Sequence, residues 1–288
     1  MKPAPFEYFR PRTLEEALAL LAEHADEAKP LAGGQSLIPA MNFRLATPAV
    51  LVDLNALPEL AYIRSDPDGL HLGGMTRQRA IERSPIVAKQ APLVAETMPF
   101  IAHAAIRNRG TVGGSLAHAD PAAELPAVML ALNARFELRS STASRTVNAD
   151  DFFLGLFATA VEPGELLTEI TVPKTPTRTG FAFQEISRRH GDFALVGVAA
   201  SVTVDEQGKC TAARVALLSV GDRPILAQHA AGALLGQVPS GEAIRAAAHA
   251  IAADDIDPSS DIHASARYRR QLANILTRRV LTVAFGRT

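Results

Sequence analysis

The feature that most constrains this chain is a pair of glycine-centred segments that lie far apart in the sequence. Residues 30–39 read PLAGGQSLIP, and residues 106–126 read IRNRGTVGGSLAHADPAAELP. Glycine lacks a Cβ, so its backbone can adopt positive φ and approach a ligand closely. Successive main-chain N–H groups in such a loop form a concave anion site, which a helix N-terminus and a serine hydroxyl reinforce. Two such loops in one domain suit a diphosphate, one loop for each phosphate.

The residues alone leave open whether these segments bind a ligand or are structural turns. Neither contains the P-loop pattern G-x-x-x-x-G-K-[ST] or the G-x-G-x-x-G of a Rossmann fold. Ser115 does not lie in a G-x-S-x-G elbow, which argues against a hydrolase. His103, His118 and His190 lack the spacing of metal ligands, so no metal site and no catalytic residue are expected.

Composition excludes further classes of protein. The formal net charge of the 288 residues is -1, so no global basic field is available to hold nucleic acid. The only cysteine, Cys210, can form neither an internal disulfide nor an iron–sulfur cluster by itself, and we expect it to be buried in a strand. This economy fits the cytoplasm. The N-terminal residues lack the apolar region of a signal peptide, and no apolar run reaches membrane-spanning length.

Hydrophobic periodicity predicts an α+β chain. Thr13 and Glu16 form a capping box before a helix, and AVLVDL (49–54) reads as a buried strand, so the first unit is β-α-β with the first glycine segment at a strand end. Asp68-Gly69 signals a turn before a strand, and Ser84-Pro85 opens a helix. We expect a further helix over 121–134, entered directly after the second glycine loop.

A change in composition at PKTPTRTG (173–180) indicates a connector. Long alternating strands follow it, and then three helices. We therefore expect a first domain at 1–175, with subdomains of about 1–55 and 56–175. The second domain, at 176–288, is expected to be an antiparallel sheet with helices on one side.

The two glycine segments, together with SRRHGDFALVGVAA (187–200), resemble the FAD-binding medium subunits of the molybdenum hydroxylases. This is the family of xanthine dehydrogenase, carbon monoxide dehydrogenase and the bacterial N-heteroaromatic hydroxylases. The similarity covers nearly the whole chain, and GGSLAHAD is most similar to the quinoline 2-oxidoreductase type. The resemblance implies a two-subdomain α/β FAD-binding domain (PCMH-type) followed by a C-terminal α+β domain.

The same resemblance implies cofactors and partners. FAD would bind to this chain, the molybdopterin cofactor to a large subunit, and [2Fe-2S] clusters to a small subunit, in a dimer of heterotrimers. The chain would relay electrons from the [2Fe-2S] partner to an external acceptor. A free-standing FAD-dependent oxidoreductase acting on a small molecule is the alternative, and a nucleotide-binding scaffold without redox function is a third candidate.

The resemblance also implies which residues hold FAD. The first segment would wrap the pyrophosphate and ribityl region, and the second would grip it from the other side. The two sets are Leu31, Ala32, Gly33, Gly34, Gln35, Ser36, Leu37 and Ile38 in the first segment, and Gly110, Thr111, Gly113, Gly114 and Ser115 in the second.

Other family positions fall outside the two segments. Ile101 and Ala102 would line the cofactor, and His118 would lie beside it. Glu124 maps to an acid toward the adenosine end, and Leu166 to a contact near the isoalloxazine or the adenine. Gln184 falls where some members carry a lysine near the flavin ring, and Phe193 is a candidate to stack on that ring. Ser115 replaces the family's usual asparagine.

Overall fold

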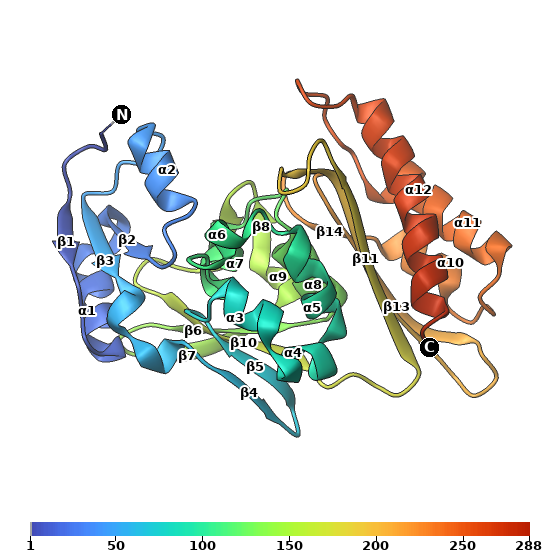
Figure 1. Cartoon of the computed structure of the whole chain (residues 1–288), viewed down its shortest axis with the longest axis horizontal. Helices are drawn as coiled ribbons and strands as arrows, with labels where there is room; N and C mark the ends of the chain where they lie inside the picture. The colour runs from blue at the N-terminus through green and yellow to red at the C-terminus, as the bar shows by residue number, and fades with distance from the viewer. Residues whose placement is uncertain (1) are drawn as a thin grey trace.

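The computed structural model describes residues 2–288 and arranges them in three units along its longest axis (Figure 1). A small sheet of N-terminal residues lies at one end, a five-stranded sheet forms the centre, and a four-stranded sheet with the C-terminal helices lies at the other end. The predicted mixture of helices and sheets is confirmed. No helix within residues 2–288 is both long and apolar enough to cross a membrane.

The N-terminal unit is a parallel three-stranded sheet in the order β1-β3-β2. Thr13 caps the first helix as predicted, accepting a hydrogen bond from the Glu16 N–H at 3.2 Å, and the Glu16 carboxylate accepts from the Arg12 N–H. The predicted β-α-β unit is therefore confirmed. Its elements are β1 (Glu7–Phe9), α1 (Leu14–His24), β2 (Ala28–Leu31), α2 (Leu37–Asn42) and β3 (Val50–Asp53).

The central unit is an antiparallel sheet in the order β4-β5-β10-β6-β7, with short helices packed on it. The predicted turn at Asp68-Gly69 and the helix at Ser84-Pro85 are confirmed. The strands are β4 (Ile63–Asp66), β5 (Gly69–Gly73), β6 (Arg135–Arg139), β7 (Ser144–Asn148), β10 (Leu166–Pro173) and the separate hairpin β8 (Phe153–Gly155) and β9 (Ala158–Thr159). The helices are α3 (Gln78–Arg83), α4 (Pro85–Gln90), α5 (Pro92–Thr97), α6 (Ala104–Arg107), α7 (Val112–His118), α8 (Glu124–Ala131) and α9 (Ala149–Phe152).

The second glycine segment differs from the prediction. It is not a loop, because its glycines lie in the first turn of α7. The following helix, α8, begins at Glu124 rather than at Pro121. Glycine is a poor helix former, so the sequence pattern favoured a loop, but side-chain capping and close packing stabilise a helix here.

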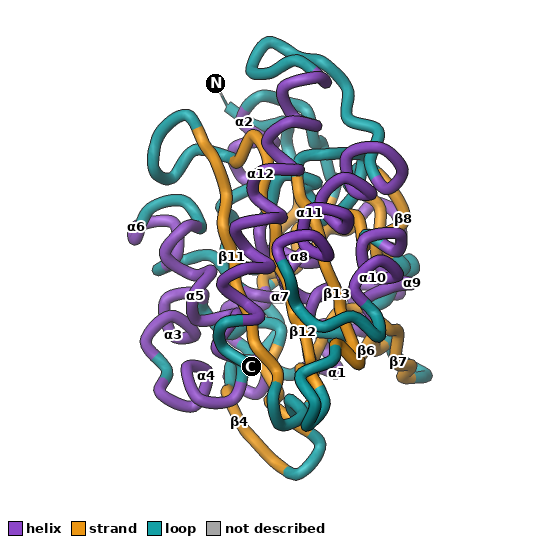
Figure 2. The backbone as a smooth tube through the Cα atoms, turned by 90° about the vertical axis from the view of Figure 1, so that its right-hand side faces the viewer, coloured by secondary structure: helices purple, strands orange, loops and turns teal. Residues whose placement is uncertain are grey.

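The C-terminal unit is an antiparallel sheet in the order β11-β12-β13-β14. Its strands are β11 (Thr179–Ser187), β12 (Ala194–Val204), β13 (Cys210–Leu218) and β14 (Ile225–Leu226), and its helices are α10 (Gln228–Leu234), α11 (Gly241–Ala250) and α12 (Ala266–Phe285). Figure 2 shows these helices lying across β11, β12 and β13. Short 3₁₀ turns at Ala25–Glu27, Leu54–Ala56, Pro58–Leu60 and Met98–Phe100 and a π-helical turn at Ile251–Asp255 complete the described structure.

Both faces of the C-terminal sheet are buried. Val196, Val198 and Val202 of β12 point toward α10, α11 and α12, and Cys210 is buried on the same side as predicted. The opposite face contributes Ala199 and other residues to the core of the central unit, where α5 and α8 pack against the strands. The helices of the C-terminal unit therefore lie on one side of its sheet, as predicted, and helices of the central unit cover the other side.

Candidate functional site

The first glycine segment is a loop with unused hydrogen-bond donors. It leaves β2 at Leu31, passes through Gly34 with φ at 71°, and enters α2 at Leu37. Among residues 2–288, no acceptor pairs with any main-chain N–H from Gly33 to Leu37, and the Ser36 side chain makes no capping bond. A half-buried row of unpaired N–H groups is costly unless water or a ligand accepts from it.

The second glycine segment uses its donors internally. The N–H groups of Val112 and Gly113 bond to the carbonyls of Thr76 and Gly74 at 3.0 and 2.9 Å. The Gly114 N–H donates to the Thr111 hydroxyl at 3.0 Å, which caps α7. A Cβ on Gly113 would lie 2.6 Å from the Gly74 carbonyl oxygen, so this glycine allows close backbone packing rather than positive φ.

The structure brings the two segments into direct contact along a line that we call the seam. A Cβ on Gly33 would overlap the Arg109 carbonyl oxygen and lie 2.8 Å from the Gly110 Cα. A Cβ on Gly114 would lie 3.4 Å from the Ala32 Cβ. The free donors of the first segment therefore lie beside the N-terminal turn of α7, a helix end that attracts negative charge. This arrangement can hold an anion such as a diphosphate.

The loop between β11 and β12, which contains the first residues of the motif at 187–200, approaches the turn at Ile101 and Ala102. Ile101 is buried, and Ala102 has φ at 44°. A Cβ on Gly191 would touch the His103 ring, whose centroid lies 6.3 Å from that of His190. The loop between β11 and β12 thus packs against His103, directly after the predicted lining residues.

Phe193 ends this loop and is exposed. Its side chain is 65% accessible, which leaves a large apolar ring free to meet a planar group. Gln184 lies on β11 opposite Val198, next to Phe183, whose ring makes an edge contact with Phe100 at 5.2 Å. Phe193 therefore lies near the Ile101 turn, because its loop packs on His103, whereas the Gln184 side chain lies on the Val198 face of the sheet, toward the C-terminal helices.

Three further predicted residues are wholly or partly buried. His118 ends α7 and packs on Phe157 with ring centroids 5.0 Å apart, and burial lowers the pKa of its imidazole. Glu124 begins α8, and burial raises the pKa of its carboxyl to about 7. Leu166 begins β10 in the core against which Ala32 of the first segment packs. The structure brings Leu166 beneath the seam, and Glu124 follows α7 in the chain.

Two residues at the seam have no counterpart in the sequence prediction. Asn55 donates to the carbonyl of Ala32 at 3.0 Å, and Arg77 donates to the carbonyl of Arg109. A signal for Asn55 existed, because it follows the buried strand β3 at the carboxyl edge of a parallel sheet, where ligands are commonly bound. No local pattern marks Arg77.

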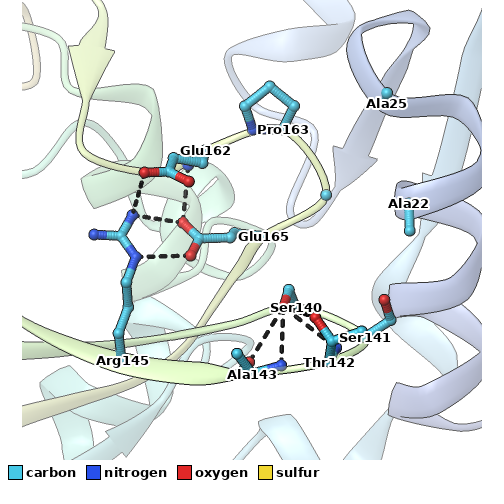
Figure 3. Close-up of a pocket in the computed structure, with 11 residues that line it drawn as sticks. Ala22, Ala25, Ser140, Ser141, Thr142, Ala143, Arg145, Glu162, Pro163 and Glu165 are labelled. Carbon is cyan, nitrogen blue, oxygen red and sulfur yellow. Dashed lines mark hydrogen bonds and ion pairs between the residues drawn. The ribbon is translucent and has the colours of Figure 1, made fainter.

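A surface hollow lies elsewhere on the molecule. It has a volume of about 530 Å³ and lies between the end of α1 and the β6–β7 hairpin (Figure 3). Its Arg145 is paired with Glu165 at 2.7 Å, and Glu162 lies 3.7 Å from the same guanidinium. None of the predicted cofactor residues lines it, so this hollow does not compete with the seam as a cofactor site. Within residues 2–288 no group of three His, Cys, Asp or Glu side chains is arranged to hold a metal ion.

The donor set at the seam fits FAD. The diphosphate needs several donors close together, and the free N–H groups from Gly33 to Leu37 provide them. The Ser36 and Ser115 hydroxyls make no side-chain hydrogen bond to another residue in the described part of the chain, so both are available as additional donors.

Comparisons with known proteins agree with this geometry. Residues 4–175 match the family model described as the FAD binding domain in molybdopterin dehydrogenase, and residues 181–284 match the CO dehydrogenase flavoprotein C-terminal domain. The chain is 44% identical to the 6-hydroxypseudooxynicotine dehydrogenase complex subunit alpha of Paenarthrobacter nicotinovorans, over 100% of this chain and 97% of the relative. It is 39% identical to the caffeine dehydrogenase subunit beta of Pseudomonas sp. (strain CBB1), again over 100% and 97%.

Solved structures are similar over the same length. A chain of carbon monoxide dehydrogenase from Hydrogenophaga pseudoflava superposes with a TM-score of 0.96 at 40% identity, covering 99% of both chains. A chain of quinoline 2-oxidoreductase from Pseudomonas putida 86 gives a TM-score of 0.93 at 40% identity, also covering 99% of both.

Proposed function

This chain belongs to the family of FAD-binding subunits of the molybdenum hydroxylases, and from that premise we propose that it binds FAD at the seam and serves as an electron relay. Electrons would arrive from a [2Fe-2S] partner and leave to an external acceptor. The main support for this proposal is the row of free N–H groups from Gly33 to Leu37, which lies against the N-terminus of α7. FAD supplies reversible electron-transfer chemistry when it is bound.

The chain's own residues position and surround the cofactor. The amides of the first segment bind the diphosphate, and the Ser115 hydroxyl adds a donor from the second segment. Ile101 and Ala102 would limit water at the flavin ring, and the ring of Phe193, which is exposed, would stack on it. The remaining residues of the two glycine segments would line the path between these two ends, and the buried Glu124 and Leu166 would support it from beneath. His118 and Gln184 stay proposed contacts.

We further propose the assembly and the domain limits that the resemblance implies. A large molybdopterin subunit and a small [2Fe-2S] subunit complete a heterotrimer, two of which form a dimer in the cytoplasm. Support comes from the names of the relatives, which are subunits or medium chains of dehydrogenase complexes. The FAD-binding domain spans 1–175 and the C-terminal domain 176–288, close to the limits of the two family matches.

The test is to purify the chain with its partners and alone. The complex is expected to contain FAD, molybdenum and iron, and the isolated chain to release a yellow flavin on denaturation. Reduced [2Fe-2S] partner is expected to bleach the flavin absorbance of this subunit. A colourless chain that takes up no added FAD would contradict the proposal. Turnover of an N-heteroaromatic substrate by the isolated chain would instead favour a free-standing oxidoreductase.

A further inference from the structure

The seam is closed by a chain of hydrogen bonds that runs through two side chains. Arg77 donates from one guanidinium nitrogen to the Arg109 carbonyl and from the other to the Asn55 side-chain oxygen at 2.6 Å. The Asn55 amide then donates to the Ala32 carbonyl at 3.0 Å. Ala32 belongs to the first glycine segment, and Arg109 belongs to the second. Two residues thus join the backbones of the two segments.

Both side chains are anchored on rigid structure. The Asn55 N–H donates to the Asp53 carboxylate at 2.9 Å, and Asp53 also accepts from the Tyr8 hydroxyl. Arg77 forms a β-bridge with Thr111, and the next residue, Gln78, donates its N–H to the Gly110 carbonyl at 2.9 Å. Contacts of the neighbouring backbone therefore hold the Arg77 guanidinium and the Asn55 amide in position independently of the bond between them.

The hydrogen bonds of Arg77 go to neutral acceptors. No acidic group of the described chain lies within ion-pair distance of Arg77 or of Arg109. Arg77 is thus placed for the geometry of its planar fork, which can serve two acceptors at once, whereas a lysine ammonium lacks that fixed fork.

The contact between the segments depends on this placement. The backbone at Gly33 lies directly against the Arg109–Gly110 peptide. The second segment is held by the Thr111–Arg77 bridge, whereas the first segment has no strand partner after Leu31, which pairs with Asp53. If the two loops separate, the free donors from Gly33 to Leu37 no longer face the N-terminal turn of α7. A ligand that spans the seam then loses contacts on one side, and binding falls because the site is no longer preorganised.

We propose that Arg77 and Asn55 are positioning residues that clamp the two glycine segments together and thereby set the affinity of the chain for FAD. This inference rests on the proposed function, because it concerns the same cofactor site. The two residues act through the backbone of the segments.

The test compares FAD binding in four variants of the full chain: R77K, N55A, the double variant, and R83K as a matched control. Arg83 is exposed on α3, and its side chain makes no hydrogen bond or ion pair within residues 2–288. The flavin-free chain is titrated with FAD by fluorescence, and its thermal unfolding is measured without FAD. R77K and N55A are each expected to raise the Kd about tenfold, which is the loss of one hydrogen bond to a charged or preorganised partner.

The double variant separates a clamp from two independent contacts. If the residues act as one unit, the double variant binds FAD about as weakly as either single variant, because the chain of bonds is already broken. The melting temperature without FAD is expected to change little, and R83K to match the unmodified chain.

Four results would overturn the proposal. R77K could bind FAD as tightly as the unmodified chain, which would mean that charge alone is sufficient. The two single effects could multiply in the double variant, or the loss of affinity could follow an equal loss of stability without FAD. If R77K fails to fold, N55A decides alone, because Asn55 is exposed and its truncation leaves no cavity in the core. An unmodified chain that binds no FAD rejects the proposed function itself and the clamp with it.

Discussion

The two glycine segments are alike in sequence and opposite in construction. From Gly33 to Leu37 the main-chain donors have no partner in the described chain, whereas those of Val112 to Ser115 are all bonded within the protein. The first segment uses glycine for its loop conformation, with φ at 71° at Gly34, and the second for close packing of α7 on Gly74. A repeated Gly-Gly pattern can thus mark a loop with free main-chain donors in one place and a closely packed helix start in another.

The largest effect is expected from adding a side chain at Gly113, where the second segment packs on Gly74. In G113A the new Cβ meets the backbone of Gly74 at 2.6 Å, and backbone cannot move aside as a flexible side chain can. Overpacking of this kind costs about 3 kcal/mol of unfolding free energy. Urea denaturation of the flavin-free chain measures it. The matched control is G232A in α10, where a Cβ meets nothing within 4 Å and about 0.5–1 kcal/mol is gained. Equal stability of G113A and the parent would contradict the packing role.

Adding a side chain at Gly33 of the first segment is expected to weaken FAD binding more than it destabilises the fold. In G33A the new Cβ overlaps the Arg109 carbonyl, so the first segment must shift away from the seam. We expect the Kd for FAD to rise about a hundredfold, which corresponds to roughly 2.7 kcal/mol. The loss of unfolding free energy without FAD is expected to be smaller than in G113A, because this loop is only half-buried. The comparison fails if G33A binds FAD normally while it loses stability as G113A does.

The acids beside the two segments are expected to give opposite responses to pH. Burial acts to raise the pKa of Asp53 beside the first segment, but hydrogen bonds from Tyr8 and Asn55 lower it overall. Burial raises the pKa of Glu124, which follows the second segment, to about 7, and that of Glu185 on β11 to about 8. The folded chain therefore holds protons on Glu124 and Glu185 that the unfolded chain releases above its ordinary carboxyl pKa.

The sign of the stability change follows from these protons. The contributions of these two carboxyls to the free energy of unfolding should fall as the pH rises from about 5 to 8, by roughly 2 kcal/mol for Glu124. His118, whose pKa burial lowers, contributes with the opposite sign below about pH 6.5 and is unchanged in the variants. E124Q removes its part of the fall and E185Q removes the remainder, which denaturation curves at pH 5, 6.5 and 8 detect. A fall of the same size in the E124Q/E185Q double variant would rule out these two carboxyls as the cause.

The smallest effect concerns the caps of the two helices that follow the segments. Thr111 caps α7 with its hydroxyl, so T111V should cost about 1 kcal/mol of unfolding free energy. Ser36 occupies the equivalent position of α2 but makes no capping bond, so S36A should leave the stability without FAD nearly unchanged. Equal losses in the two variants would mean that the helix starts are not built differently.

Much of this fold could be predicted from local patterns. The capping box at Thr13, the turn at Asp68-Gly69 and the alternating valines of β12 specify their elements through short-range hydrogen bonds and burial, which the sequence displays. The start of α7 could not be predicted, because its glycines disfavour a helix and only the packing on Gly74 reverses that preference.

The site could be predicted in its segments but not in its connections. Glycine pairs and a serine predicted a candidate cofactor site, and the resemblance predicted FAD, which the family match supports. The proposed role of Arg77 depends on its hydrogen bond to the Arg109 carbonyl, which lies far along the chain, and no local sequence pattern predicts such a contact. The assignment of individual residues to parts of FAD stays a prediction.

The C-terminal sheet shares its apolar interior with the helices before the connector at 174–178. Phe181, Phe183 and Leu218 belong to the same cluster as Leu125 and Leu93, so the two sequence domains share one hydrophobic core, beside the separate core under the C-terminal helices. Cutting the connector would expose a large hydrophobic surface on each fragment. Separately expressed fragments should therefore aggregate unless they are coexpressed. Calorimetry of the intact chain should accordingly show a single unfolding transition.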